Sequence, residues 1–158
     1  MATVLISYYS RSGNTRRMAE FVKEGLEKID SIEVVLKKVK DTELTDLLDA
    51  DGIIIGSPTY FGGMAAEVKD LMDRSVKYFG KLNGKAGGAF TSSGGIAGGN
   101  ETTLLSILQG LLIHGMVVQG VQKGGHYGPV AVGAPDELIQ AECFNYGKLV
   151  GELTLKLS

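Results

Sequence analysis

The chain has 158 residues, of which 44% are hydrophobic and 22% are charged, which is enough to bury a substantial core within one domain. Sixteen basic and eighteen acidic residues give a net charge of -2, which argues against a nucleic-acid partner. A single Cys excludes an intrachain disulfide and a cysteine-based zinc site, and no apolar run reaches the ~20 residues of a membrane span. We therefore expect one cytoplasmic domain over residues 1–158, without a metal site or membrane insertion.

Apolar runs that read as strands alternate with helical patterns along the whole chain. Strands are predicted at residues 4–8, 32–39, 53–55, 85–91 and 116–121, of which the second, at 32–39, alternates loosely and is expected to be more exposed. Helices are predicted between them, with a short one after the second strand and longer ones at residues 14–29, 64–79, 102–114 and 135–157. Because apolar strands that alternate with helices form a parallel sheet covered on both faces, the pattern predicts a doubly wound α/β domain.

Glycine is the unusual feature of the composition. The chain has 23 glycines, about twice the usual share of ~7%. Fifteen of them lie between Gly80 and Gly133, a segment that contains only four charged residues. Such a concentration indicates backbone that turns sharply or lies close to a ligand.

Three predicted loops follow the first, third and fourth strands and contain no acidic residue: residues 10–15, 57–63 and 91–100. Since ligands of open α/β sheets bind outside the carboxyl ends of the strands, we expect the loops to share one site. The first loop, Ser10 to Thr15, leads into a helix, where free N–H groups and the helix dipole favour a phosphate. The GxGxxG and GxxxxGK[ST] nucleotide signatures are both absent.

The first loop resembles the [ST]-x-[ST]-G-x-T phosphate loop of the flavodoxins. Further segments resemble the WrbA-type NAD(P)H:quinone oxidoreductases in the same order along nearly the whole chain: Ser57–Met64, Val68–Asp73, Phe90–Gly95, Gly99–Leu105, His114–Val118 and Gly124–Gly128. The resemblance implies a flavodoxin-like, five-stranded parallel sheet of order 2-1-3-4-5 with helices on both faces. It also implies non-covalent FMN, NADH or NADPH as electron donor, and two-electron reduction of a quinone by hydride transfer through flavin N5.

The resemblance assigns most of the expected site residues to the three loops. The residues expected to contact FMN are Ser10, Arg11, Ser12, Gly13, Asn14, Thr15, Pro58, Thr59, Tyr60, Phe61, Gly62, Ser92, Ser93, Gly94, Gly95, Ile96, Ala97 and His114. Tyr60 or Phe61 is expected to stack on the isoalloxazine ring. His126 and Tyr127, in a glycine-rich loop after the fifth strand, are the expected proton donors to a reduced quinone.

Other proteins with this strand order have different functions. Flavodoxins that only carry electrons place carboxylates near the flavin, whereas the second and third loops here have none, which favours a reductase over an electron carrier. Response-regulator receivers need acidic residues where this chain has Tyr8, Tyr9 and Ser10, so a receiver is disfavoured. A flavin-free binding protein stays open, although the intact phosphate-loop residues argue against it.

The chain departs from the family pattern at two places. The family commonly has paired histidines where this chain has Ile113 and His114, so His114 either contacts the flavin or caps a helix end. The segment at about residues 40–51 is shorter than is common in the family, and the chain has no Trp. In the family, a longer segment and a Trp contribute to the tetramer and to the quinone pocket. A homo-oligomer, dimer or tetramer, is implied, and the apolar helix at Leu104 to Ile113 is either buried internally or forms a contact between copies.

Overall fold

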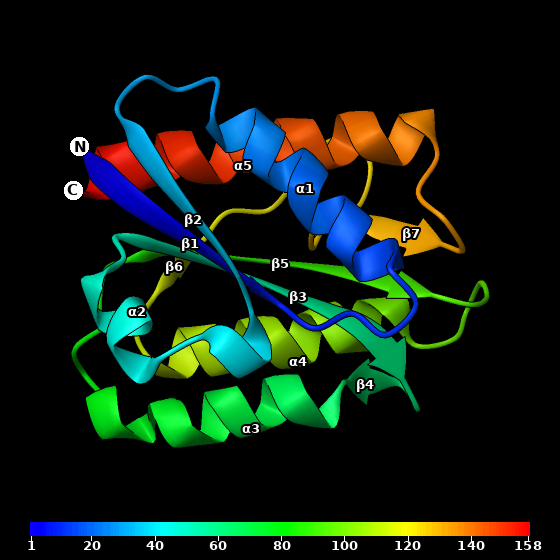
Figure 1. The fold of residues 1–158 in the computed structure, drawn as a ribbon, viewed down its shortest axis with the longest axis horizontal. Coiled ribbons are helices and arrows are strands. Elements are labelled where there is room, and N and C mark those ends of the chain that lie inside the picture. Colours follow the sequence, from blue (N-terminus) through cyan, green and yellow to red (C-terminus); the bar gives the residue numbers. More distant parts are fainter.

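A parallel sheet runs through the middle of the molecule, between two layers of helices (Figure 1). The computed structural model describes all 158 residues. The strands follow the order β2-β1-β3-β5-β6, with bounds β1 Ala2–Tyr8, β2 Ile32–Lys38, β3 Gly52–Tyr60, β5 Ala86–Ser93 and β6 Val117–Val118. The predicted order 2-1-3-4-5 is confirmed, with β5 and β6 as the fourth and fifth strands in the path.

The fifth strand differs from its prediction because it is split. β6 pairs with Ala86 and Gly87 at the start of β5, and a separate strand β7 (Val130–Val132) pairs with the end of β5. Residues 119–129 leave the sheet between the two strands and form a loop that the Val121 N–H closes by donating to the His126 carbonyl. Four glycines and a proline in this loop interrupt the strand pattern.

The helices lie in two layers, α1 and α5 on one face of the sheet and α2, α3 and α4 on the other (Figure 1). Their bounds are α1 Asn14–Leu26, α2 Leu44–Asp49, α3 Ala66–Arg74, α4 Asn100–Ile113 and α5 Glu137–Leu157. The predicted helix at residues 64–79 is shorter than expected, since 3-10 turn η2 (Ser75–Tyr78) follows α3 and Met64 belongs to strand β4 (Gly63–Met64). None of the helices combines the length and apolar composition needed to cross a membrane.

The sheet separates two hydrophobic cores. Alternate residues of β1 face opposite sides, so Val4 and Ile6 pack under α1 and α5 while Leu5 packs towards α3 and α4. The three consecutive isoleucines of β3 divide in the same way, with Ile54 in the first core and its two neighbours in the second. This two-sided burial explains why these strands read as continuous apolar runs.

Candidate functional site

The three glycine- and hydroxyl-rich loops meet at the carboxyl edge of the sheet, at the right of Figure 1. The Thr15 hydroxyl, at the start of α1, lies 2.8 Å from the Ser92 hydroxyl at the end of β5. The Thr102 hydroxyl of α4 donates to the Gly62 carbonyl at 2.7 Å. The Thr59 hydroxyl, near the end of β3, lies 2.8 Å from the Thr91 hydroxyl of β5. These contacts join all three loops into one surface, as the sequence predicted.

The first loop presents a helix N-terminus without a side-chain cap. Gly13 precedes α1 with φ +103°, a left-handed conformation that favours glycine. Its N–H bonds to the Ser10 hydroxyl at 3.1 Å, and the first turn of α1 contains no acidic residue. The uncapped N–H groups and the positive end of the helix dipole therefore favour an anion at this position.

The second loop is a tight hairpin with an exposed aromatic tip. Strand β4 runs antiparallel to β3, pairing Tyr60 with Gly63. The two residues between them, Phe61 and Gly62, both have positive φ, +48° and +78°, as in a type I′ turn. Phe61 is fully exposed, and a bulky residue in the left-handed region is uncommon. An exposed, conformationally strained aromatic beside an anion site is a candidate ligand contact.

The third loop supplies bare backbone beside the hairpin. Gly94 and Gly95 are exposed and Ile96 is 89% exposed, while Ala97 adopts a left-handed φ of +58°. Gly99, with φ +102°, precedes α4 and packs directly against Gly62 of the hairpin. The loop thus places a second helix N-terminus without a side-chain cap at the same edge as the first.

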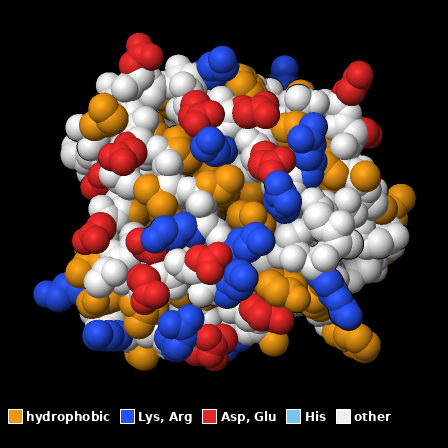
Figure 2. Space-filling view, viewed as in Figure 1, with side chains coloured by type: hydrophobic (Ala, Val, Ile, Leu, Met, Phe, Trp, Pro, Cys, Tyr) orange, Lys and Arg blue, Asp and Glu red, His pale blue; other side chains and the backbone are white.

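The space beside the loop glycines shows whether a flat ligand could lie against these loops. A methyl group added at any of five glycines in these loops would touch no protein atom within 4 Å: Gly13, Gly62, Gly63, Gly94 and Gly95. Figure 2 shows a broad surface without charged side chains over this end of the molecule, with scattered basic and acidic side chains around it. An uncapped helix start for a phosphate, exposed backbone N–H and C=O groups, and an aromatic tip match the chemistry of FMN.

The loop surface is open on the side of α3. A cavity of about 720 Å³ adjoins the first loop, between the ends of β1 and β2 and one side of α3 from Ala66 to Arg74. Ser10, Tyr8 and Tyr9 line it together with residues of both charges: Lys38, Lys40, Glu67, Asp70 and Arg74. A ligand of the loops would therefore lie on an accessible surface, where a second substrate can approach.

The structure does not bring His114 to this site. His114 ends α4, fourteen residues and therefore ~20 Å along the helix from its start at the loops. The ring is buried near the amino ends of the strands, where Nε2 lies 2.8 Å from the Ser75 hydroxyl. Desolvation lowers its pKa. The expectation of a flavin contact within one chain is therefore corrected, because α4 points away from the loops.

His126 and Tyr127 lie in the loop between β6 and β7, along the outer edge of the sheet. The neighbouring Gly128 packs against the Ala89 carbonyl in the middle of β5, short of its carboxyl end. His126 Nδ1 bonds to the Val121 carbonyl of the same loop at 2.8 Å, and both side chains are exposed. Neither makes a hydrogen bond to the three loops, and their role as proton donors stays a prediction.

Several supporting residues were not predicted. Buried Asn100 accepts a hydrogen bond from Thr59 at 3.3 Å, and Tyr9 meets the Tyr60 ring edge-on with centroids 6.4 Å apart. Polar residues at strand ends and helix starts were the available signal for Asn100 and Thr91. Nothing in the order of residues pairs Tyr9 with Tyr60, because their contact depends on how the hairpin folds back.

Comparisons with known proteins decide the family. The profile of the NADPH-dependent FMN reductase family matches residues 44–126, more than half of the chain. The chain belongs to this family. It is also 32% identical to an NAD(P)H dehydrogenase (quinone) of Archaeoglobus fulgidus, over 99% of this chain and all of that one. A flavodoxin of Aquifex aeolicus is 39% identical over 96% of this chain and 86% of its own length.

A solved structure gives the same result at the level of the fold. A flavodoxin, WrbA-like protein from Agrobacterium tumefaciens superimposes with a TM-score of 0.86 and 29% identity, covering both chains completely. An archaeal flavodoxin follows with a TM-score of 0.83 and 27% identity. The predicted flavodoxin-like fold and WrbA-type resemblance are thereby confirmed. This FMN reductase family member therefore resembles both reductases and flavodoxins.

Proposed function

We propose that this protein binds FMN at the three loops and acts as an NAD(P)H-dependent quinone reductase. The observation that carries the proposal is the open, uncapped backbone of the loops, with five glycines facing empty space beside an uncapped helix start. The similarity to a quinone-type NAD(P)H dehydrogenase along the whole chain supports it. When bound, FMN supplies the transfer of two electrons between nicotinamide and quinone.

The residues of this chain would then bind and orient the cofactor. The loop from Ser10 to Thr15 would hold the phosphate through backbone N–H groups and hydroxyls. Phe61 and Tyr60 would cover one face of the ring system, and the backbone of Ser92 to Ala97 would meet its polar edge. None of these loop segments carries a carboxylate, so they add no local negative charge that opposes an electron-rich flavin.

A second function, electron carriage without NAD(P)H oxidation, is supported by the flavodoxin relatives. The Aquifex aeolicus flavodoxin covers almost the whole chain at higher identity than the dehydrogenase. The loops distinguish the two functions. The second and third loops contain no acidic residue, and this favours the reductase. The reductase is therefore the function that the site supports best.

Reconstitution distinguishes these proposals. The purified chain is incubated with FMN, the excess is removed, and the visible spectrum and the FMN dissociation constant are measured. NADH and NADPH oxidation are then followed with and without a benzoquinone. We expect retained FMN and quinone-dependent oxidation. Retained FMN with inert NADH and NADPH would support the electron carrier, and no retained FMN would overturn both functions.

A further inference from the structure

The cavity of about 720 Å³ beside the first loop has no role in the function proposed so far. Ser10, whose hydroxyl accepts a hydrogen bond from the Gly13 N–H at 3.1 Å, belongs both to the loop and to the cavity wall. Tyr9 also lines the cavity, and its ring meets the Tyr60 ring edge-on with centroids 6.4 Å apart. The cavity therefore adjoins the residues proposed to hold the phosphate and to cover the ring of FMN.

Two lysines line this cavity at the end of β2. Lys38 is the last residue of β2, and Lys40 lies two residues beyond it. Both are exposed and neither forms an ion pair, whereas the preceding Lys37 pairs with Asp46 at 2.8 Å. In the register of the sheet Lys38 lies opposite Tyr8, one strand spacing of ~5 Å from the strand that leads into the first loop.

Helix α3 adds charges of both signs to the opposite wall of the cavity. Arg74 and Asp70 pair with each other at 2.8 Å, which leaves Glu67 as the one carboxylate of the cavity without an ion-pair partner. Two unpaired lysines, Lys38 and Lys40, thus face one unpaired carboxylate. This surplus of positive charge favours an anionic ligand. Glu67 can accept a hydrogen bond from an amino or hydroxyl group of the same ligand.

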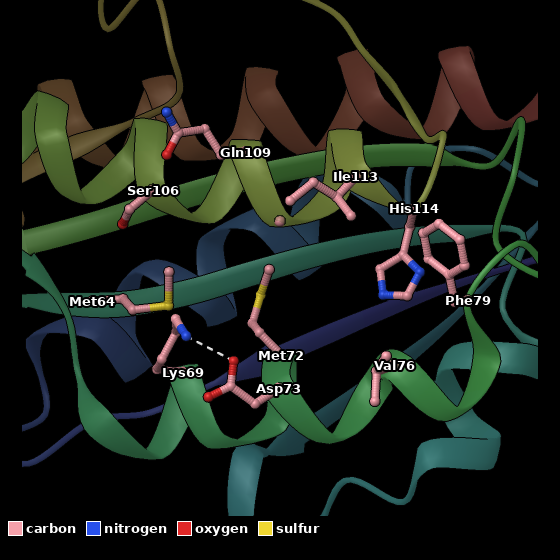
Figure 3. Close-up of a pocket in the computed structure, with 11 residues that line it drawn as sticks. Met64, Lys69, Met72, Asp73, Val76, Phe79, Ser106, Gln109, Ile113 and His114 are labelled. Carbon is pink, nitrogen blue, oxygen red and sulfur yellow. Dashed lines mark hydrogen bonds and ion pairs between the residues drawn. The ribbon is translucent and has the colours of Figure 1, made fainter.

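The other two large cavities of the chain lack this surplus. Figure 3 shows the cavity of about 540 Å³ between α3 and α4, where Lys69 and Asp73 are the charged residues and pair with each other at 2.7 Å. The cavity of about 590 Å³ between α5 and the loop at residues 119–129 contains one residue of each sign, Lys123 and Glu142. Of the three, the cavity at the first loop is therefore the one suited to an anion.

We propose that this cavity binds the adenosine half of NADPH, with Lys38 and Lys40 on its 2′-phosphate. The proposal rests on the NAD(P)H-dependent function proposed above, since a donor whose nicotinamide meets the flavin must place its adenosine half close by. NADPH differs from NADH only in the 2′-phosphate, a monoester that carries a charge of about −1.5 to −2 at pH 7. Lysine binds a phosphate as a point charge, without the fixed geometry that arginine requires. The two lysines thereby select NADPH over NADH.

The place of the two lysines in the fold supports this assignment. Ligands of open α/β sheets lie beyond the carboxyl ends of the strands. In dinucleotide-binding sheets an acidic residue downstream of the phosphate loop binds the ribose 2′-hydroxyl of NAD, and a basic residue accommodates the 2′-phosphate of NADP. Lys38 and Lys40 stand at the carboxyl end of β2, the next strand after the first loop. The cavity volume of about 720 Å³ is also typical of small-molecule sites.

Calorimetric titration of the FMN-loaded chain with two adenosine nucleotides tests the site directly. At one fixed ionic strength, adenosine 2′,5′-bisphosphate should bind about tenfold or more tightly than adenosine 5′-monophosphate, because it alone carries the 2′-phosphate. Equal affinities, or displacement of FMN by the bisphosphate, would overturn the proposal. The same titration of the FMN-free chain keeps this test independent of whether FMN is retained.

The decisive variant combines Lys38→Gln with Lys40→Gln, and its matched control combines Lys28→Gln with Lys81→Gln. The control removes the same charge from two exposed lysines that form no ion pair and precede β2 and β5, at the opposite edge of the sheet. The cavity variant should lose the preference for the bisphosphate, and the control should keep it. A preference that survives in the cavity variant, or that the control loses equally, would overturn the assignment. Circular dichroism checks that both variants fold.

Steady-state kinetics with a benzoquinone distinguishes a failure of this proposal from a failure of the reductase. The FMN-loaded wild type should show a kcat/KM about tenfold higher for NADPH than for NADH, and the cavity variant should lose this preference through a higher KM for NADPH. Equal kcat/KM values for the two donors in the wild type would overturn the 2′-phosphate site and leave the reductase standing. Inertness of both donors would overturn the reductase, and the calorimetric preference would then decide the nucleotide site alone.

Discussion

Two sets of glycines in this protein have opposite surroundings. Between α1 and α5, a methyl group added at Gly25 or Gly147 would collide with the backbone carbonyl of the facing helix, that of Phe144 or Val22. At the carboxyl edge, a methyl group at Gly94 or Gly95 would meet nothing within 4 Å. These two sets of glycines therefore have different roles, the close packing of two helix backbones and open space at the candidate site.

This comparison separates stability from ligand binding. Glycines of the first kind let α1 and α5 pack closely, and their replacement acts on the fold. Glycines of the second kind contribute no packing, so their replacement is expected to act only where a ligand occupies the space beside them. Valine substitutions at one glycine of each kind test the distinction directly.

The largest effect is expected at the helix contact. Gly25→Val should lower the free energy of unfolding by about 3 kcal/mol or more, because its side chain meets the Phe144 carbonyl and neither backbone can move without displacing a helix. Urea unfolding followed by circular dichroism measures the change. A loss of less than about 1 kcal/mol would mean that the two helices separate easily, contrary to their close packing.

The matched substitution at the loop should have the reverse profile. Gly94→Val is expected to change the free energy of unfolding by no more than about 0.5 kcal/mol, because the added side chain is in water. It should raise the FMN dissociation constant about tenfold or more, a loss of about 1.4 kcal/mol, by filling the space proposed for the ring. Quenching of flavin fluorescence on titration measures this constant. Wild-type FMN affinity in Gly94→Val would show that the ring does not lie beside Gly94.

A mixed effect, on both stability and affinity, is expected where the two roles meet. Thr15→Val removes the hydroxyl that lies 2.8 Å from Ser92 and leaves a buried hydroxyl without its partner, which should cost about 1–2 kcal/mol of stability. The same change should weaken FMN binding, since Thr15 belongs to the proposed phosphate loop. Ser92→Ala is the control, because it breaks the same bond from the other loop. Equal stability losses with a larger affinity loss for Thr15→Val would support the phosphate role.

The fold and the three loops could be predicted because their signals are local. Continuous apolar runs such as Ile53 to Ile55 predict strands that are buried on both faces. Parallel topology then brings the carboxyl ends of these strands to one edge of the sheet. The hydroxyl-rich stretch from Ser10 to Thr15 predicts a helix start with free N–H groups, and α1 begins there at Asn14 without a side-chain cap. These features depend on residues close together in the chain.

The features that were missed or misplaced depend on distant residues. Strand β7 has three residues, too few to show alternation, and exists because β5 offers it an edge. The left-handed turn at Phe61 follows from the pairing of Thr59 with Met64. His114 was assigned to the flavin by family resemblance, although the length and direction of α4 carry it to the other end of the sheet.

The smallest expected effect is a change in how the free energy of unfolding depends on pH, caused by His114 at the end of α4. Burial lowers the pKa of His114 below its usual value of 6.5, so the folded chain holds the ring neutral at a pH where the unfolded chain binds a proton. The contribution of His114 to the free energy of unfolding is therefore complete above pH 6.5 and declines as the pH falls below it. His114→Gln, whose amide can still form a hydrogen bond with the Ser75 hydroxyl, should remove this decline. Urea unfolding of both proteins between pH 7 and pH 5 measures the difference, and parallel pH profiles would mean that other groups cause it.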